Sequence, residues 1–225
     1  MNSALFADRR DAGRRLAERL ARFKDQAPVV LALPRGGVPV AFEIAKSLDA
    51  PLDLALVRKI GAPNQPELAV AAVVDGDEPE TVVNEVIAAS LHVTEDYLHD
   101  EAARQSREID RRRQLYLGDR PRADITGHLA IVVDDGIATG ATVRAALRAI
   151  RRRKPARLVL TTAVAPSDTL ARLRAEVDDI VCLATPEPFH AIGPYYADFA
   201  QTDDDEVIAL LRQAPHQTTT AAETG

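Results

Sequence analysis

The sequence contains no tryptophan, one methionine and one cysteine among its 225 residues, and aromatic side chains make up only 4% of it. A single cysteine, Cys182, excludes an intramolecular disulfide, which fits a reducing compartment. Its apolar neighbours favour a core position over a reactive one. No apolar run is long enough to span a bilayer, and no apolar signal segment follows the N-terminus. We therefore expect a cytoplasmic protein that is not bound to a membrane.

The sequence also lacks a surplus of positive charge. Its formal net charge is −6, and only four of its 28 basic residues are lysines, which argues against nonspecific binding to nucleic acids. Hydrophobic residues make up 46% of the chain and charged residues 28%, a composition typical of a soluble globular protein. We expect one domain over residues 1–213 and a disordered tail over residues 214–225.

The most informative stretch covers residues 129–142. It begins with five apolar residues, which predict a strand buried on both faces of a parallel sheet. Asp134 and Asp135 follow where this strand should end. A short loop with two glycines comes next, and Thr142 is predicted to cap a helix over residues 143–153.

This stretch carries the groups that a sugar phosphate requires. A loop that enters a helix N-terminus presents unpaired backbone N–H groups and the positive end of the helix dipole, which together bind phosphate. The hydroxyls of Thr139 and Thr142 add donors. The carboxylates of Asp134 and Asp135 can accept hydrogen bonds from vicinal sugar hydroxyls or coordinate a hard cation such as Mg²⁺. An acidic pair alone would be read as a solvated turn, but the whole stretch favours a sugar-phosphate site.

A second strand–loop–helix unit precedes this stretch. It has an apolar strand over residues 29–33, the sequence Pro-Arg-Gly-Gly at residues 34–37 and a helix over residues 38–48. Both loops would open at the carboxyl edge of one parallel sheet, so they can bind the two ends of one ligand. A further strand over residues 51–57 should end at a basic pair.

The rest of the chain alternates between strands and helices. Residues 68–74 and 81–83 predict a hairpin, and residues 94–117 predict a long charged helix. Acidic residues alternate with the arginines of this helix, so we expect residues 111–113 on a solvated or dimer-facing surface. Strands over residues 157–164 and 179–183, with helices over 167–176 and from 203 to 212, complete the pattern. This alternation predicts an α/β fold with a doubly wound parallel sheet.

Residues 129–142 closely resemble the phosphoribosyl-pyrophosphate (PRPP) signature of type I phosphoribosyltransferases. The resemblance implies the fold of that family, with a lid hairpin, a long inserted helix and a small C-terminal hood around the parallel sheet. The lid and the helical insertion would occupy about residues 60–127. The resemblance also implies Mg²⁺-dependent transfer of the 5-phosphoribosyl group from PRPP to a nitrogen of a nucleobase or a similar small acceptor.

The same resemblance implies a role for each candidate site residue. Asp134 and Asp135 would be the catalytic acids that bind the ribose hydroxyls and Mg²⁺. The 5′-phosphate would lie on the loop made of Gly136, Ile137, Ala138, Thr139, Gly140, Ala141 and Thr142. Pyrophosphate would contact Arg35, Gly36, Gly37 and Lys59, with Arg58 as the second basic candidate. A solvated basic pair is the alternative for Arg58 and Lys59.

Three assignments outside the two loops also depend on the resemblance. Glu67, at the base of the hairpin, would be a lid acid that assists catalysis. Phe189 would stack on the acceptor, a kind of contact worth roughly 1–3 kcal/mol in nucleic-acid complexes. Asp198 would be a ligand of a second Mg²⁺. An aromatic cluster that pins the C-terminal segment to the sheet is the alternative for this part of the chain.

One position departs from the purine-type pattern. Ala138 stands where hypoxanthine-guanine-type enzymes carry an aspartate near the purine, so the sequence identifies neither a general base nor the acceptor. A noncatalytic PRPP-binding regulator and a sugar-phosphate hydrolase therefore stay open as alternatives. The long charged helix is compatible with a homodimer.

Overall fold

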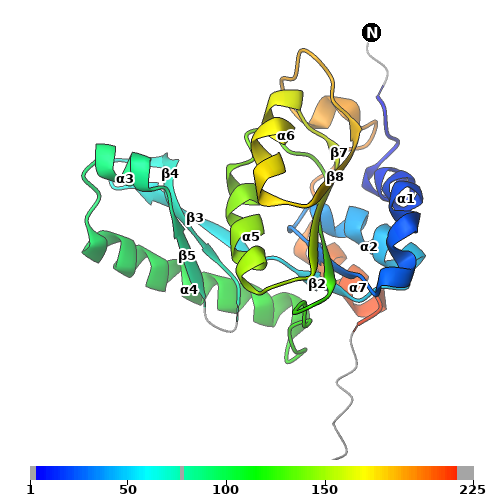
Figure 1. Ribbon diagram of the computed structural model, residues 1–225, viewed down its shortest axis with the longest axis horizontal. Coiled ribbons are helices and arrows are strands. Elements are labelled where there is room, and N and C mark those ends of the chain that lie inside the picture. The colour runs from blue at the N-terminus through cyan, green and yellow to red at the C-terminus, as the bar shows by residue number, and fades with distance from the viewer. Residues whose placement is uncertain (1–3, 77–78, 217–225) are drawn as a thin grey trace, which may run out of the picture.

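The computed structural model describes residues 4–76 and 79–216, apart from the side chain of Glu67. Its central layer is a sheet of five parallel strands in the order β2-β1-β6-β7-β8 (Figure 1). The strands are β1 (Val29–Ala32), β2 (Leu52–Leu54), β6 (Leu129–Asp134), β7 (Arg157–Val164) and β8 (Asp179–Ala184). β1, β6 and β7 form from runs of mostly buried residues, half of them β-branched, a composition that fits strands covered on both faces.

Helices cover both faces of this sheet (Figure 1). Ile131 and Val133 of β6 point into the core beneath α1, α2 and α7, whereas Ala130 and Val132 point into the core beneath α5 and α6. The bounds are α1 (Arg9–Leu20), α2 (Gly37–Leu48), α5 (Ala141–Arg152), α6 (Ser167–Leu173) and α7 (Asp204–Gln213). The prediction of a doubly wound parallel α/β fold is confirmed.

The strand order places a switch point between β1 and β6. From β1 the chain passes to α2 on one face of the sheet, and from β6 it passes to α5 on the other face. Between two such neighbouring strands the connecting loops diverge and leave a crevice at the carboxyl ends, which is where open α/β sheets bind ligands. Residues 33–36 and 135–140 are the two loops that flank this crevice.

A second sheet of three antiparallel strands projects to one side of the central layers, in the order β3-β4-β5 (Figure 1). Its strands are β3 (Val57–Ala62), β4 (Gln65–Val74) and β5 (Glu80–Val83), followed by the helices α3 (Glu85–Ser90) and α4 (Glu95–Leu117). The predicted hairpin thus forms as β4 and β5, with β3 added. Thr94 caps α4 by accepting a hydrogen bond from the N–H of Tyr97.

A buried ionic cluster fastens this sheet and α4 to the central layers. Arg113 of α4 is only 8% exposed, and it reaches Asp53 of β2 at 3.4 Å and Asp75 at 2.9 Å. Arg122 also pairs with Asp75, at 2.6 Å, and the N–H of Ala123 donates to Asp53. The expectation that residues 111–113 form a solvated face is therefore wrong for Arg113.

Four element boundaries differ from the predictions. α5 starts at Ala141 after Gly140, which has φ 76°, so Thr142 is not the helix cap. Ser167 does not cap α6, because Pro166 precedes the first turn and the Ser167 hydroxyl bonds Glu187 instead. Arg58 and Lys59 lie within β3 and not at the end of a strand over 51–57.

The fourth difference from the predictions concerns the C-terminal boundary of the domain. Ala214 is buried, and the oxygen of Pro215 accepts a hydrogen bond from the N–H of Leu52, so the described chain packs on the core beyond the expected limit of 213. Residues 217–225 lie outside the described part. Three 3₁₀ helices complete the fold, namely η1 (Ala21–Gln26), η2 (Arg174–Glu176) and η3 (Gly193–Tyr195). Among the described residues, no helix is both long enough and apolar enough to cross a membrane.

Candidate active site

The two acids at the end of β6 interact through their carboxyl groups, but their other neighbours differ. Asp135 lies on the face of α1 and α2. Its carboxylate pairs with Arg9 Nε at 2.7 Å, and its side chain is 11% exposed. Its backbone oxygen accepts a hydrogen bond of 2.6 Å from the Tyr196 hydroxyl. Asp135 is therefore held by the protein itself.

Gly36 makes room for this arrangement. A Cβ atom at position 36 would lie 2.2 Å from Oδ2 of Asp135, a distance at which the atoms would overlap. The first loop can therefore approach the second only with glycine here. Close contact of the two loops thus requires glycine at position 36.

Asp134 lines a cavity of about 200 Å³ at the switch point, together with Arg58, Arg112 and Thr142. The Asp134 carboxylate accepts a hydrogen bond of 3.0 Å from the N–H of Asp135 and also interacts with the carboxyl group of Asp135, and it makes no ion pair among the described residues. Burial, and next the negative charge of Asp135, raise the pKa of the Asp134 carboxyl well above its ordinary range. A cation or a pair of sugar hydroxyls at this carboxylate would offset both effects.

The loop after the acids is held by two hydrogen bonds, whereas three of its backbone N–H groups are available to a ligand. The N–H of Ile137 donates to the oxygen of Val164, and the Thr169 hydroxyl donates to the oxygen of Ala138. The N–H groups of residues 138–140 have no acceptor among the described residues. With the first turn of α5 they form an anion site of the kind found where a loop enters a helix.

The first loop, residues 33–36, carries Arg35 at its tip. The Arg35 side chain is 35% exposed and lies 3.5 Å from Oδ1 of Asp204. The same carboxylate oxygen accepts a hydrogen bond of 2.6 Å from the Tyr116 hydroxyl. Burial and the bond to Asp204 raise the pKa of Tyr116 to about 12, so this hydroxyl keeps its proton at neutral pH. Arg35 thus connects the site to α7, and Gly37, which follows the loop, is the first residue of α2.

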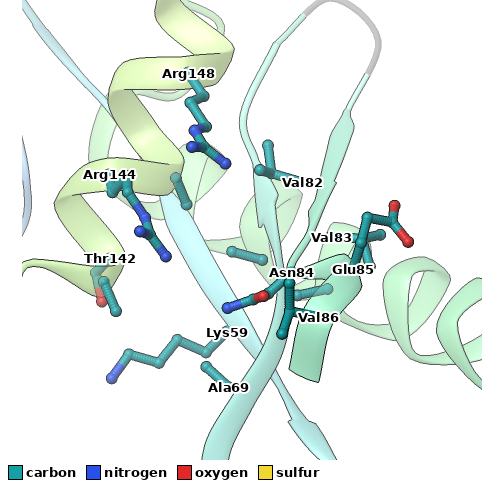
Figure 2. A pocket seen from close by; sticks show the side chains of 14 residues that line it. Lys59, Ala69, Val82, Val83, Asn84, Glu85, Val86, Thr142, Arg144 and Arg148 are labelled. Atoms are coloured by element: carbon teal, nitrogen blue, oxygen red, sulfur yellow. The ribbon is translucent and has the colours of Figure 1, made fainter. Parts of the chain in front are cut away.

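The basic pair of β3 is divided between two cavities. Arg58 faces the Asp134 cavity, and its Nε donates to Oε1 of Gln105 on α4 at 3.1 Å. Lys59 points the other way, into a separate cavity between the second sheet and α5 (Figure 2). Arg112 reaches the Asp134 cavity from α4 and was missed by the sequence analysis. The signal for Arg112 was its helical spacing, three residues after the apolar Ile109 that faces the same cavity.

Neither Phe189 nor Asp198 is among the residues that line the Asp134 cavity. Phe189 stacks on Tyr195 with ring centroids 5.7 Å apart, which is the aromatic cluster left open as an alternative. Asp198 is exposed and accepts a hydrogen bond from the N–H of Ala200. The backbone of Glu67 lies in β4, and its side chain is outside the described residues.

The comparisons with known proteins show the family and the fold of this chain. The family model described as "Phosphoribosyl transferase domain" matches residues 4–199. The chain belongs to the phosphoribosyl transferase family. The recognition of type I phosphoribosyltransferases from residues 129–142 is therefore confirmed, as is their parallel α/β fold.

Two relatives show how far the similarity of this family member extends. A Mycobacterium tuberculosis protein, Rv0571c, which bears the provisional name phosphoribosyl transferase, is 48% identical over 210 residues, covering 93% of this chain and 47% of the relative. This chain thus spans about half the length of the curated relatives it matches. The crystal structure of TT1426 from Thermus thermophilus superposes with a TM-score of 0.82 at 42% identity, covering 93% of this chain and 98% of that one.

Proposed function

We propose that this protein transfers the 5-phosphoribosyl group from PRPP to a nitrogen of a nucleobase or a similar small acceptor, with Mg²⁺, and releases pyrophosphate. The observation that carries the proposal is the pair of loops at one switch point, with Asp134 facing the cavity beside them. An anion site, a free carboxylate and two guanidinium groups lie around one crevice. These are the groups that a phosphorylated sugar with a pyrophosphate substituent requires.

Each part of PRPP has a place in this arrangement. The 5′-phosphate would accept hydrogen bonds from the N–H groups of residues 138–142 and from the hydroxyls of Thr139 and Thr142. The ribose hydroxyls would donate to Asp134. The pyrophosphate would lie near the first loop, residues 33–36, and between Arg58 and Arg112. We therefore favour Arg58 over Lys59 as the basic pyrophosphate contact of β3.

The residues present fit a Mg²⁺ ion that is bound mainly through its substrate. Among the described residues no group of three His, Cys, Asp or Glu side chains could hold a metal. Mg²⁺ is commonly bound by one or two carboxylates together with substrate phosphates and water, and Asp134 can supply one carboxylate. Asp135 is paired with Arg9 and Asp198 is exposed, so neither is proposed as a ligand. When bound, Mg²⁺ would neutralise charge on the leaving pyrophosphate.

The protein's own groups would act by position and charge. The bond between ribose C1 and the pyrophosphate oxygen breaks, and the electron pair leaves with pyrophosphate. The acceptor nitrogen forms the new bond to C1 with its lone pair and releases its proton to solvent or buffer. Arg58 and Arg112 would stabilise the departing anion. The second sheet, which borders the crevice through Arg58, would limit the access of water to the cationic sugar.

The test measures pyrophosphate release from PRPP and Mg²⁺ with a panel of purines, pyrimidines and small amines, and with no acceptor. We expect release that depends on one acceptor class and falls at least a hundredfold in Asp134→Asn. Asp100→Asn is the matched control, because its side chain is 87% exposed on α4. Release at the wild-type rate in a folded Asp134→Asn variant would mean that Asp134 has been assigned wrongly.

A noncatalytic PRPP-binding regulator is the second candidate. It is favoured by position 138, where an alanine backbone oxygen bonds Thr169 and the side chain can transfer no proton. PRPP binding in calorimetry without release for any acceptor would support the regulator. Release without an acceptor would instead indicate a sugar-phosphate hydrolase.

A further inference from the structure

A second cavity, of about 350 Å³, lies between α5 and the second sheet (Figure 2). It borders the Asp134 cavity, because Thr142 lines both. The two spaces otherwise have different walls. The second cavity extends along α5 past Arg144 to Arg148, and its opposite wall is formed by β4, β5 and the start of α3.

Small side chains create this space. At one end the sheet and the helix pack directly, through Ala72 and Val74 of β4 against Ala145 and Ala149 of α5. Beyond that contact, alanines of β4 and of the first turn of α5 line the walls and leave the space that larger aliphatic side chains would fill. Its volume falls within the range of about 300–1,000 Å³ usual for small-molecule sites. The alanines and valines among the lining residues make part of the walls apolar.

The polar groups around this surface are hydrogen-bond donors. Arg144 and Arg148 lie one helical turn apart on α5, and Lys59 faces them from β3 (Figure 2). Among the described residues, the side chains of Lys59 and Arg144 make no hydrogen bond or ion pair. Arg148 is shared with Glu176, whose Oε1 lies 2.9 Å from its Nε.

Asn84 adds a fourth donor. Its side-chain oxygen accepts a hydrogen bond from the N–H of Ile87, which leaves the amide NH₂ free, and Figure 2 shows this nitrogen directed into the cavity. Glu85 is the one acid among the lining residues, and its carboxylate points away from the three basic side chains (Figure 2). A cavity with these donors selects a ligand with more than one negative charge.

We propose that this cavity binds a phosphate monoester that carries an apolar group. The phosphate would lie between Arg144, Arg148 and Lys59, where guanidinium groups can bond two of its oxygens at once. The apolar group would lie on the alanines of β4 and α5. None of the three basic residues of this site lines the Asp134 cavity. Ala141 and Thr142, which belong to the loop proposed for the 5′-phosphate of PRPP, also line this second cavity.

The position of the ligand has a mechanical consequence. A phosphate held by α5 on one side and by Lys59 and Asn84 on the other would join the second sheet to the central layers. Local opening of β4 and β5 would then become less favourable. Hydrogen exchange of the amides of these two strands should therefore slow when the ligand is bound.

The test uses 4-nitrophenyl phosphate as the probe, with inorganic phosphate and 4-nitrophenol as separate arms, in isothermal titration calorimetry at low salt. We expect the full probe to bind most tightly and 4-nitrophenol not to bind. Arg144→Gln should weaken binding of the probe about tenfold, the loss of one charge-assisted contact. Lys59→Gln should also weaken it. Arg151→Gln is the matched control on the same helix, because Arg151 pairs with Asp178 outside the cavity.

Three results would overturn the proposal. The first is no binding of 4-nitrophenyl phosphate to the wild-type protein at millimolar concentration. The second is unchanged affinity in Arg144→Gln and Lys59→Gln, which would place the probe on the backbone donors of residues 138–142. The third is equal affinity for inorganic phosphate and for the full probe, which would remove the apolar part of the site. Lys59 is exposed, so Lys59→Gln keeps the test open if Arg144→Gln does not fold.

Discussion

Asp135→Asn and Asp134→Asn change adjacent carboxylates, yet we expect them to have opposite effects on stability. Asp135 and Arg9 form an ion pair of 2.7 Å with side chains 11% and 12% exposed. The Arg9 guanidinium also donates to the oxygen of Ala200 and lies over the ring of Phe199. Asparagine keeps a hydrogen-bond acceptor but removes the charge, so a partly buried guanidinium loses its counterion.

A charged hydrogen bond of this kind contributes about 1.5–3 kcal/mol, so we expect Asp135→Asn to lower the free energy of unfolding by about 2 kcal/mol. For a chain of 225 residues this corresponds to a fall in melting temperature of about 4–8 °C. Urea unfolding followed by circular dichroism measures the free energy, and scanning calorimetry measures the temperature. A folded Asp135→Asn variant as stable as the wild type would refute the anchoring role of Asp135.

Asp134→Asn should not destabilise the protein at neutral pH. The direction of its effect on the free energy of unfolding follows from the pKa of the Asp134 carboxyl. Burial, and next the charge of Asp135, raise the folded-state pKa of Asp134 above the unfolded value near 3.9. The folded protein therefore binds this proton more tightly and loses stability as the pH rises through the folded pKa. Asparagine has no proton to lose. The stability of Asp134→Asn relative to the wild type should increase as the pH rises from the unfolded-state pKa through the raised folded-state pKa of Asp134, and the opposite trend would contradict the burial of this carboxylate.

The remaining predictions concern the ionic cluster and the two loop glycines. Arg113→Met should lower the free energy of unfolding by about 3 kcal/mol in urea titrations, because it leaves Asp53 with backbone donors but without its cation. Gly36→Ala should weaken PRPP binding at least tenfold in calorimetry, because its Cβ atom would displace the carboxylate of Asp135; unchanged binding would show that the loops need not touch. Gly140→Ala should cost about 1–3 kcal/mol in thermal unfolding, since φ is 76° there.

The central sheet was predictable because its signals are local. Each of β1, β6 and β7 is a short apolar run bounded by turn residues, and such runs form buried strands wherever helices cover both faces. The two glycine loops were predictable for the same reason, since glycines between a strand and a helix are a local signal for a turn. Three residues separate Gly136 and Gly140 of the second loop, and a Cβ atom at either position would lie within 3.0 Å of a neighbouring side chain.

The second sheet and the ionic cluster were not predictable in full, because their signals are distant in sequence. β3 contains Arg58, Lys59 and Gly61, a composition that does not favour a strand, and it forms because β4 pairs with it along its length. Arg113 reads as one of three exposed arginines. It is buried because Asp53 and Asp75, 60 and 38 residues away, supply its partners.

The alternation of side chains along a strand explains why neighbours in the sequence do not share a task. Asp134 and Asp135 occupy successive positions at the end of β6, so one carboxylate faces the crevice and the other faces α1. Arg58 and Lys59 occupy successive positions in β3, so each lines a different cavity. A motif of two like residues suggests a joint role only when the segment is a loop. At both places the segment is a strand, or the residue directly after one. In the first pair Asp134 lines the crevice and Asp135 pairs with Arg9, and in the second pair Arg58 and Lys59 line one cavity each.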